Sequence, residues 1–127
     1  MKTKLFTISI AALALTMFAG DFGSVGLVIV DRKHDGEPLR TGVVYLGSPA
    51  ERAGIKPNGF LISVDGTNVV SMSLTQSMSF VRGPIGTDVT LELADSTRSH
   101  TNKFTVTRQR TVFSGHGADM KVEFFDH

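Results

Sequence analysis

The chain has 127 residues, a formal net charge of +1 and no cysteine. This length suits one domain built around a single hydrophobic core. The mixed, nearly balanced charge excludes the basic footprint of a nucleic-acid-binding protein, and the lack of cysteine excludes disulfides, thiol catalysis and cysteine-ligated zinc.

The N-terminal residues have the layout of a secretory signal peptide. Lys2 and Lys4 form a basic start, and the apolar run from Leu5 to Ala19 is short for a membrane span. We therefore predict a signal peptide at residues 1–20 and a secreted or periplasmic protein. A buried N-terminal helix and an uncleaved anchor are the alternatives, and a membrane is an expected partner only if this segment is retained.

Two β-rich runs follow, separated by a polar loop. Residues 25–30 and 41–46 are rich in β-branched side chains, and the loop at 31–38 contains Gly36 and Pro38. We predict a β-hairpin from these segments.

The next stretch, residues 47–66, reads GSPAERAGIKPNGFLISVDG and combines a short helix with a strand. Ser48 is placed to cap the helix, and Glu51 is placed to complete a capping box. Gly54 suits the left-handed conformation that ends such a helix. Residues 60–64 are predicted to form a buried strand that is closed by a tight turn.

A second helix is predicted over residues 71–82. Ser73 is a natural N-cap, and Gly83-Pro84 would end the helix. Phe80 is expected on a line that faces the core. One face of this helix carries apolar side chains at the i, i+4 and i+7 spacing, namely Leu74, Met78 and Val81.

Alternating apolar and polar residues then predict a second hairpin. Residues 88–93 and 103–108 place apolar side chains at every other position, with the polar stretch 95–102 between them. In residues 111–127, which follow, the segment MKVEFF alternates again. We interpret this last segment as an added edge strand or a partly ordered tail.

The stretch 47–66 resembles the most recognisable part of a PDZ domain of the bacterial type found in C-terminal processing and HtrA-type proteases. It departs from that pattern at Asn58-Gly59, where the family usually has Gly-Asp, but asparagine tolerates the left-handed turn. The resemblance covers roughly residues 24–110. The matching positions are Gly47, Ser48, Pro49, Ala50, Ala53, Gly54, Ile55, Lys56, Leu61, Val64, Asp65 and Gly66.

The resemblance implies an α+β, mainly β fold in the circularly permuted order of bacterial PDZ domains. We expect a partly open antiparallel β-barrel or sandwich of five to six strands, capped by two helices. The chain would then divide into a signal peptide at 1–20, a PDZ domain at 21–110 and a C-terminal extension at 111–127 that offers an extra strand.

The same resemblance implies a site, because PDZ domains bind the C-terminal end of a peptide by β-strand addition. The family's carboxylate-binding loop corresponds to Ser24, Val25, Gly26 and Leu27, with Ser24 in place of the first glycine of the family. The implied groove residues are Val28, Ile29, Leu74, Met78 and Val81. The alternatives are an ordinary strand that begins after a glycine loop, and helix residues that serve only the core.

The groove would favour ligands that end in an apolar residue, any residue and an apolar residue with a free carboxylate. Leu74 stands where PDZ domains that prefer serine or threonine two residues before the end carry histidine. Apolar peptides or protein C-termini are therefore the expected partners, and nucleic acid is not. The alternatives are an adaptor of an envelope protease or secretion system, and a degenerate structural domain whose own Phe124-Phe125 tail occupies the groove.

No catalytic residue, metal or cofactor is predicted, and we expect no enzymatic activity. The chain has four histidines, which fall in predicted loops or at the terminus without a paired metal-ligand spacing. No glycine loop of the phosphate-binding type precedes a helix. A loose metal set of His116, Asp119, Asp126 and His127 is the less favoured alternative.

Overall fold

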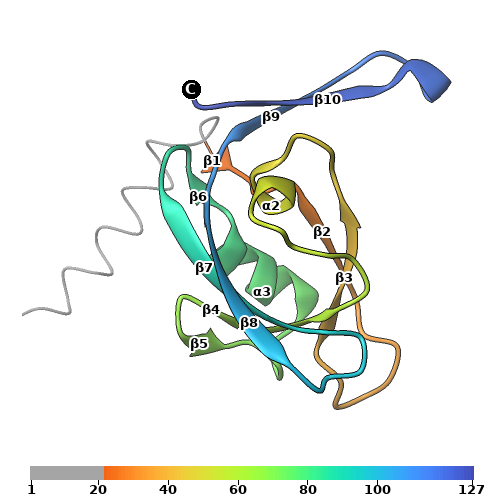
Figure 1. Ribbon diagram of the computed structural model, residues 1–127, viewed down its shortest axis with the longest axis vertical. Coiled ribbons are helices and arrows are strands. Elements are labelled where there is room, and N and C mark those ends of the chain that lie inside the picture. The colour runs from red at the N-terminus through yellow and green to blue at the C-terminus, as the bar shows by residue number, and fades with distance from the viewer. Residues whose placement is uncertain (1–21) are drawn as a thin grey trace, which may run out of the picture.

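A six-stranded antiparallel sheet dominates the computed structural model, which describes residues 22–127 (Figure 1). The strand order is β2-β3-β4-β7-β8, and β5 pairs with β4. The predicted signal peptide at residues 1–20 lies outside the described residues. The strands of this sheet are β2 (Leu27–Val30), β3 (Leu39–Val44), β4 (Phe60–Val64), β5 (Thr67–Asn68), β7 (Asp88–Ala94) and β8 (Thr101–Thr107).

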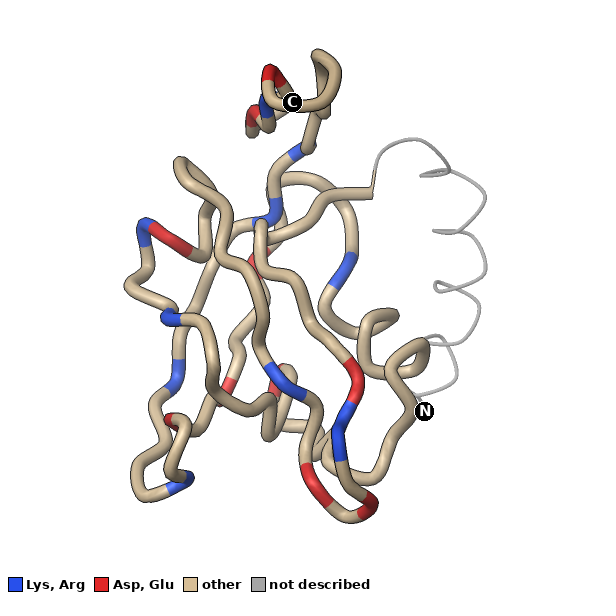
Figure 2. The backbone as a smooth tube through the Cα atoms, turned by 90° about the vertical axis from the view of Figure 1, so that its right-hand side faces the viewer, with Lys and Arg blue, Asp and Glu red and all other residues tan. Residues whose placement is uncertain are grey.

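Two small antiparallel sheets complete the β structure. In one, β1 (Phe22–Gly23) pairs with β6 (Gly83–Pro84). In the other, β9 (Arg110–Ser114) pairs with β10 (Lys121–Phe125), and the 3-10 helix Gly117–Asp119 lies between them. Figures 1 and 2 show this β9–β10 hairpin at one end of the molecule, beyond the main sheet. The division into residues 21–110 and 111–127 stays a prediction.

The first described helix, α2 (Pro49–Arg52), is capped much as the sequence predicts. The hydroxyl of Ser48 accepts a hydrogen bond from the N–H of Glu51 at 3.1 Å. The Glu51 carboxylate, however, accepts from the N–H of Gly47 at 2.7 Å, because the N–H of Ser48 is already bonded to the carbonyl of Tyr45. The capping box is thus half formed. Gly54 ends the helix with φ 89°, as predicted.

The second helix, α3 (Leu74–Val81), has a complete capping box. Ser73 Oγ accepts from the N–H of Gln76 at 3.1 Å, and Gln76 Oε1 accepts from the N–H of Ser73 at 3.0 Å. The helix begins later than residue 71, since the N–H of Met72 bonds to the carbonyl of Val69 in a turn.

The expectation for Phe80 was wrong. Its side chain is 41% exposed, whereas Ser77 and Val81 are buried. Residues 77 and 81 lie one helical turn apart on the line that faces the sheet, and Phe80 lies about 100° of rotation away from Val81.

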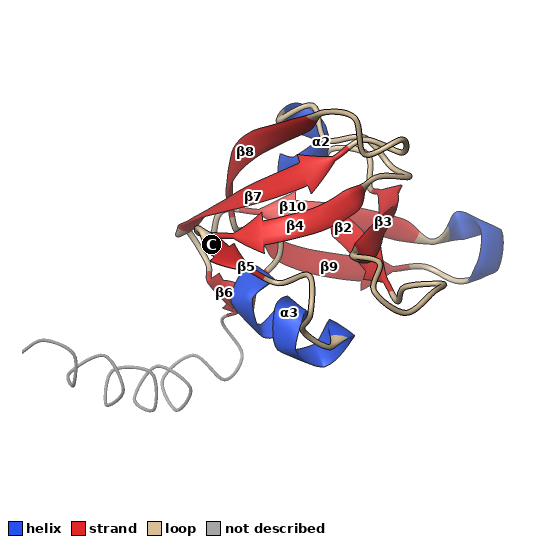
Figure 3. Cartoon of the chain, turned by 90° about the horizontal axis from the view of Figure 1, so that it is seen from below, coloured by secondary structure: helices blue, strands red, loops and turns tan. Residues whose placement is uncertain are grey.

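The core lies between the sheet and the two helices. The predicted alternation in β7 is confirmed, because Val89, Leu91 and Leu93 are all buried. In the register of β7 with β8, Val89 pairs with Val106 and Leu91 pairs with Phe104. Figure 3 shows α3 and α2 on opposite sides of the molecule, with α3 against β2 and β4 and α2 against β8. The predicted fold class, mainly β with two helices, is confirmed.

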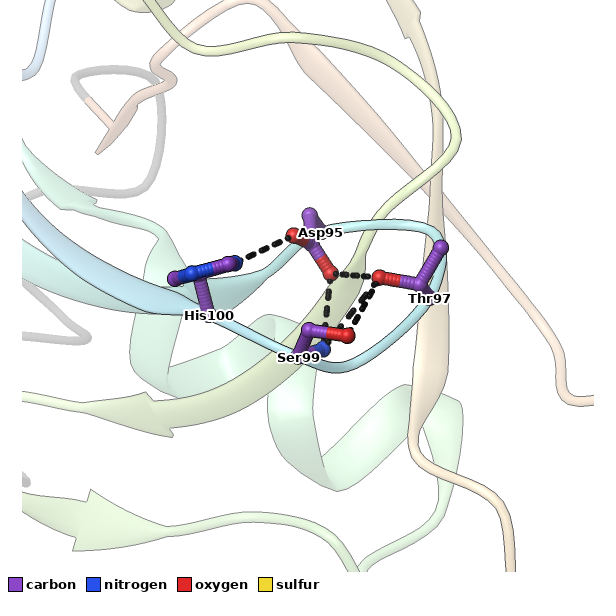
Figure 4. A network of polar contacts seen from close by, with 4 residues as sticks. All are labelled: Asp95, Thr97, Ser99 and His100. Carbon is purple, nitrogen blue, oxygen red and sulfur yellow. Dashed lines mark hydrogen bonds and ion pairs between the residues drawn. The ribbon is translucent and has the colours of Figure 1, made fainter.

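The turn between β7 and β8 is organised by one carboxylate (Figure 4). Asp95 Oδ1 accepts hydrogen bonds from the hydroxyl of Thr97 at 2.9 Å and from the N–H of Ser99 at 3.0 Å. Asp95 Oδ2 lies 3.3 Å from His100 Nδ1. The bond from Thr97 is the main cause that lowers the pKa of Asp95 below its usual value. The cluster stabilises a hairpin turn and is separate from the groove described next.

Charges of both signs are spread along the described chain (Figure 2). No helix among residues 22–127 has the length and apolar character needed to cross a membrane.

Candidate functional site

An apolar groove of about 450 Å³ lies between the edge strand β2 and the helix α3. All residues that the sequence assigned to the carboxylate loop and the groove line this one cavity. They come from two distant parts of the chain, which the fold brings together. That these residues bind a peptide stays a prediction. The residues concerned are Ser24, Val25, Gly26, Leu27, Val28, Ile29, Leu74, Met78 and Val81.

The outer edge of β2 is free among the described residues, because β2 pairs only with β3. The N–H of Tyr45 donates to the carbonyl of Gly26 at 3.0 Å, so this carbonyl faces β3. Polar groups alternate along an antiparallel strand, and the N–H and C=O of Leu27 therefore face the groove. Within residues 22–127 the N–H groups of Val25 and Gly26 have no acceptor. These N–H groups are therefore available to hydrogen-bond a strand that adds at this edge.

Gly26 is required for the shape of the loop. Its φ of 78° lies in the left-handed region, and a Cβ there would overlap Ser48 Cβ and lie 3.0 Å from the ring of Phe124. The close approach that glycine permits is thus to the N-cap of α2.

The loop is anchored on both sides by backbone hydrogen bonds. Ser24 and Gln109 exchange two N–H···O bonds of 2.9 Å each. The carbonyl of Val25 accepts from the N–H of Ala50 at 2.9 Å. Because of these bonds the loop position is set by the start of β9 and by α2. Ser24, which replaces the family's glycine, fits this geometry as a half-buried residue.

The helix wall serves the groove and the core together. Val81 is buried in the core, while Leu74 and Met78 are partly buried and pack against it. These helix residues therefore line the groove and also belong to the core, and the two interpretations are compatible.

The C-terminal end of α3 is held by the buried side chain of Arg108. Its Nε donates to the carbonyl of Val81 at 2.9 Å, and its Nη2 donates to the carbonyl of Phe80 at 3.1 Å. These bonds satisfy carbonyls that a helix end leaves unpaired. Burial lowers the pKa of the Arg108 guanidinium. The alternation of Phe104 and Val106 in β8 points to an inward residue 108, a signal that sequence reasoning did not use.

Sequence reasoning missed further residues that line the groove, namely Tyr45, Arg82, Thr111 and Phe113. Arg82 directly follows Val81, so its position at the helix end could have been predicted from the sequence. Tyr45 and Phe113 stack edge to face with their ring centroids 6.1 Å apart. Thr111 and Phe113 belong to β9, and only the tertiary fold reveals that this strand reaches the groove.

The C-terminal hairpin borders the groove without pairing to β2. Within the described chain β10 pairs with β9, and the ring of Phe124 lies near Gly26. Residues of the loose metal set have other contacts here. Asp126 accepts from Gln109 Nε2, and the carbonyl of His127 accepts from Arg110 Nε at 2.6 Å. The described residues contain no group of three or more His, Asp or Glu that could hold a metal ion.

Comparison with known proteins relates this chain to a family. Residues 40–95 match the family model of the PDZ domain. The carboxyl-terminal-processing protease of a Synechocystis species is 33% identical over 90 residues, which are 71% of this chain and 21% of that protein.

Two solved structures share the fold. The photosystem II D1 C-terminal processing protease superposes with a TM-score of 0.67 and 28% identity, over 84% of this chain and 29% of that one. The PDZ domain of the carboxy-terminal protease from Vibrio cholerae, solved in complex with a peptide, gives a TM-score of 0.58 at 20% identity, over 69% of this chain and 93% of that one.

The fold and the matched segment define a PDZ domain. More particularly, the chain carries a PDZ domain homologous to that of the carboxyl-terminal processing proteases, as the sequence predicted. The match spans 21% of the length of the Synechocystis relative.

Proposed function

We propose that this chain binds peptides or protein C-termini, which add as a strand to the outer edge of β2. The observation that carries the proposal is the free edge of β2 opposite the apolar wall of α3, together with the unused N–H groups of Val25 and Gly26 in the loop before β2. Main-chain hydrogen bonds of this kind supply affinity in β-strand addition, and side-chain pockets supply specificity. The Vibrio cholerae PDZ domain, which shares this fold, was solved in complex with a peptide, and this supports peptide binding here.

The lining of the groove favours an apolar ligand end with a free carboxylate. Leu27, Met78 and Val81 supply apolar surface for a C-terminal side chain. Leu74 lines the groove at the start of α3, where an apolar residue two positions before the ligand's end would lie. Arg82 is the only charged residue among the described lining residues, and it borders the carboxylate loop. A positive charge at this end complements a carboxylate.

We further infer that the described domain acts by binding and not by catalysis. The polar side chains that line the groove are the hydroxyls of Ser24, Tyr45 and Thr111 and the guanidinium of Arg82. This set offers a hydroxyl without a neighbouring general base, so it lacks the pairing that activates a nucleophile.

Export and an adaptor role complete the proposal. Export rests on the sequence of residues 1–20, and an adaptor role beside an envelope protease rests on the homology to the protease PDZ domain. Cell fractionation of the full chain tests export, and a chain that stays in the cytosol would contradict it. A self-occupied groove is less favoured, because the structure leaves a cavity of about 450 Å³ there.

A C-terminal peptide library screened against the full chain tests the binding proposal. We expect enrichment of apolar residues at the last position and two positions before it. Amidation of the peptide terminus should lower affinity at least about ten-fold, because a hydrogen-bonded charge is lost. Equal affinity for acid and amide, or no binding at all, would contradict the proposed mode.

A further inference from the structure

A hydrogen-bonded pair of hydroxyl groups lies at the carboxylate end of the groove. Ser24 Oγ and Thr111 Oγ1 are 2.7 Å apart. Both residues line the groove, and both also line an adjoining cavity of about 450 Å³ that includes Arg82 and Arg110. The hydroxyl pair therefore stands where the two cavities meet.

The hydroxyl pair has one O–H that its own hydrogen bond does not use. Each hydroxyl carries one proton, and the bond between the two oxygens uses one of them. Neither hydroxyl has another hydrogen-bond partner within residues 22–127. One O–H is thus left to donate to a group that enters either cavity.

The position of this donor is fixed by the backbone. Ser24 is held by its two bonds to Gln109, and Thr111 lies two residues further along, in β9. The next residues of the loop, Val25 and Gly26, carry the unused N–H groups. The side chain of Ser24 adds an O–H that a glycine at this position could not supply. Ser24 and Thr111 both lie outside residues 40–95, the segment that matches the family model.

Building on the binding function proposed above, we propose that the Ser24–Thr111 hydroxyl pair determines specificity for a free C-terminal carboxylate. It donates an O–H to the carboxylate beside the N–H groups of Val25 and Gly26. The β9–β10 hairpin is then part of the binding site.

The test compares two forms of one decapeptide that ends in Val-Ala-Val, the free acid and the C-terminal amide. Calorimetry gives the ratio of their affinities for the full chain. The double variant Ser24→Ala/Thr111→Val removes both hydroxyls and should lower the acid-to-amide ratio about ten-fold, because a hydrogen bond to a charged group is lost. Each single variant should lower it less, since the remaining hydroxyl can still donate. Thr111→Ser should keep the wild-type ratio.

The chain offers a matched control. Thr90 Oγ1 and Thr105 Oγ1 form a second hydroxyl pair, 2.9 Å apart, across β7 and β8 and away from the groove. Thr90→Val/Thr105→Val should leave the ratio unchanged.

The outcomes separate this inference from the proposal on which it rests. If the wild type prefers the acid and the Ser24→Ala/Thr111→Val variant keeps that preference, the hydroxyl pair has only a structural role and the inference is overturned. If the wild type binds neither peptide, the proposed function is wrong, and the inference that depends on it is overturned as well. Should the double variant not fold, Ser24→Ala alone must lower the ratio, and an unchanged ratio would again overturn the inference.

Discussion

The two edges of the main sheet differ in what they offer to another strand. The edge strand β2 is short and apolar, and it faces the wall of α3 across a groove. At the opposite edge, β8 exposes polar and charged side chains, which discourage pairing with another chain. The exposed side chains of β8 are Thr101, Asn102, Lys103, Thr105 and Thr107.

This contrast teaches that a free edge does not make a binding site by itself. At β2 the fold adds a helix as a second wall, a loop with unused N–H groups and an arginine at the end proposed to hold the carboxylate. At β8 the sequence protects the edge instead. Substitutions at the β2 edge and in the turn that leads into β8 test this difference.

The largest effect should follow Gly26→Ala, which damages the β2 edge directly. The backbone of the alanine must adopt the left-handed conformation, and its Cβ would overlap Ser48. We therefore expect the free energy of unfolding to fall by about 3 kcal/mol. Peptide binding should be lost as the loop shifts. Denaturant unfolding measures the first effect, and calorimetry measures the second.

Gly36→Ala is the matched control. Gly36 has φ 86°, but a Cβ there meets nothing within 4 Å, so only the conformational cost of about 1 kcal/mol applies. Equal losses for the two variants would show that the contact with Ser48 is unimportant.

A smaller effect should follow truncation of the helix wall. Met78→Ala removes apolar surface from the groove and should weaken peptide binding about ten-fold. Phe80→Ala on the same helix removes a side chain that is 41% exposed and does not line the groove, so affinity should stay within about two-fold. Titration calorimetry distinguishes the two, and a reversed order would place the ligand elsewhere.

The smallest effect is expected in the turn between β7 and β8, which leads into the β8 edge. The pKa of Asp95 is lowered from 3.8, so its carboxylate stabilises the fold above that pH and loses this contribution as the pH falls through the lowered pKa. Asp95→Asn should therefore flatten the loss of stability below about pH 4, as thermal unfolding at several pH values can measure. Peptide affinity at neutral pH should not change. A change in affinity would show that the two edges are coupled.

Much of the fold and of the site was accessible from local patterns. The period-2 alternation gave the buried residues of β7, and the i, i+4, i+7 spacing gave the apolar face of α3. The resemblance to PDZ domains then assigned that face to the groove. The tight turn at Asp65-Gly66 joins β4 to β5 as expected, with Asp65 and Gly66 at positive φ. These features depend on neighbouring residues only, which is why the sequence predicts them.

The remaining features depend on contacts between distant segments. Thr111 reaches Ser24 across 87 residues, and no local pattern encodes that contact. The exposure of Phe80 depends on how α3 is rotated against the sheet. The partner of the Glu51 carboxylate depends on a bond that Ser48 makes to Tyr45 in the preceding loop.

The neighbouring residues Arg108 and Gln109 together fix the spacing between the two walls of the groove. The side chain of Arg108 holds the end of α3, and the backbone of Gln109 holds Ser24 at the start of the opposite wall. One peptide unit thus acts as a spacer that sets the distance between the two walls before any ligand arrives. The domain then has little of its own conformational entropy to lose on association, and the ordering cost falls mainly on the incoming chain.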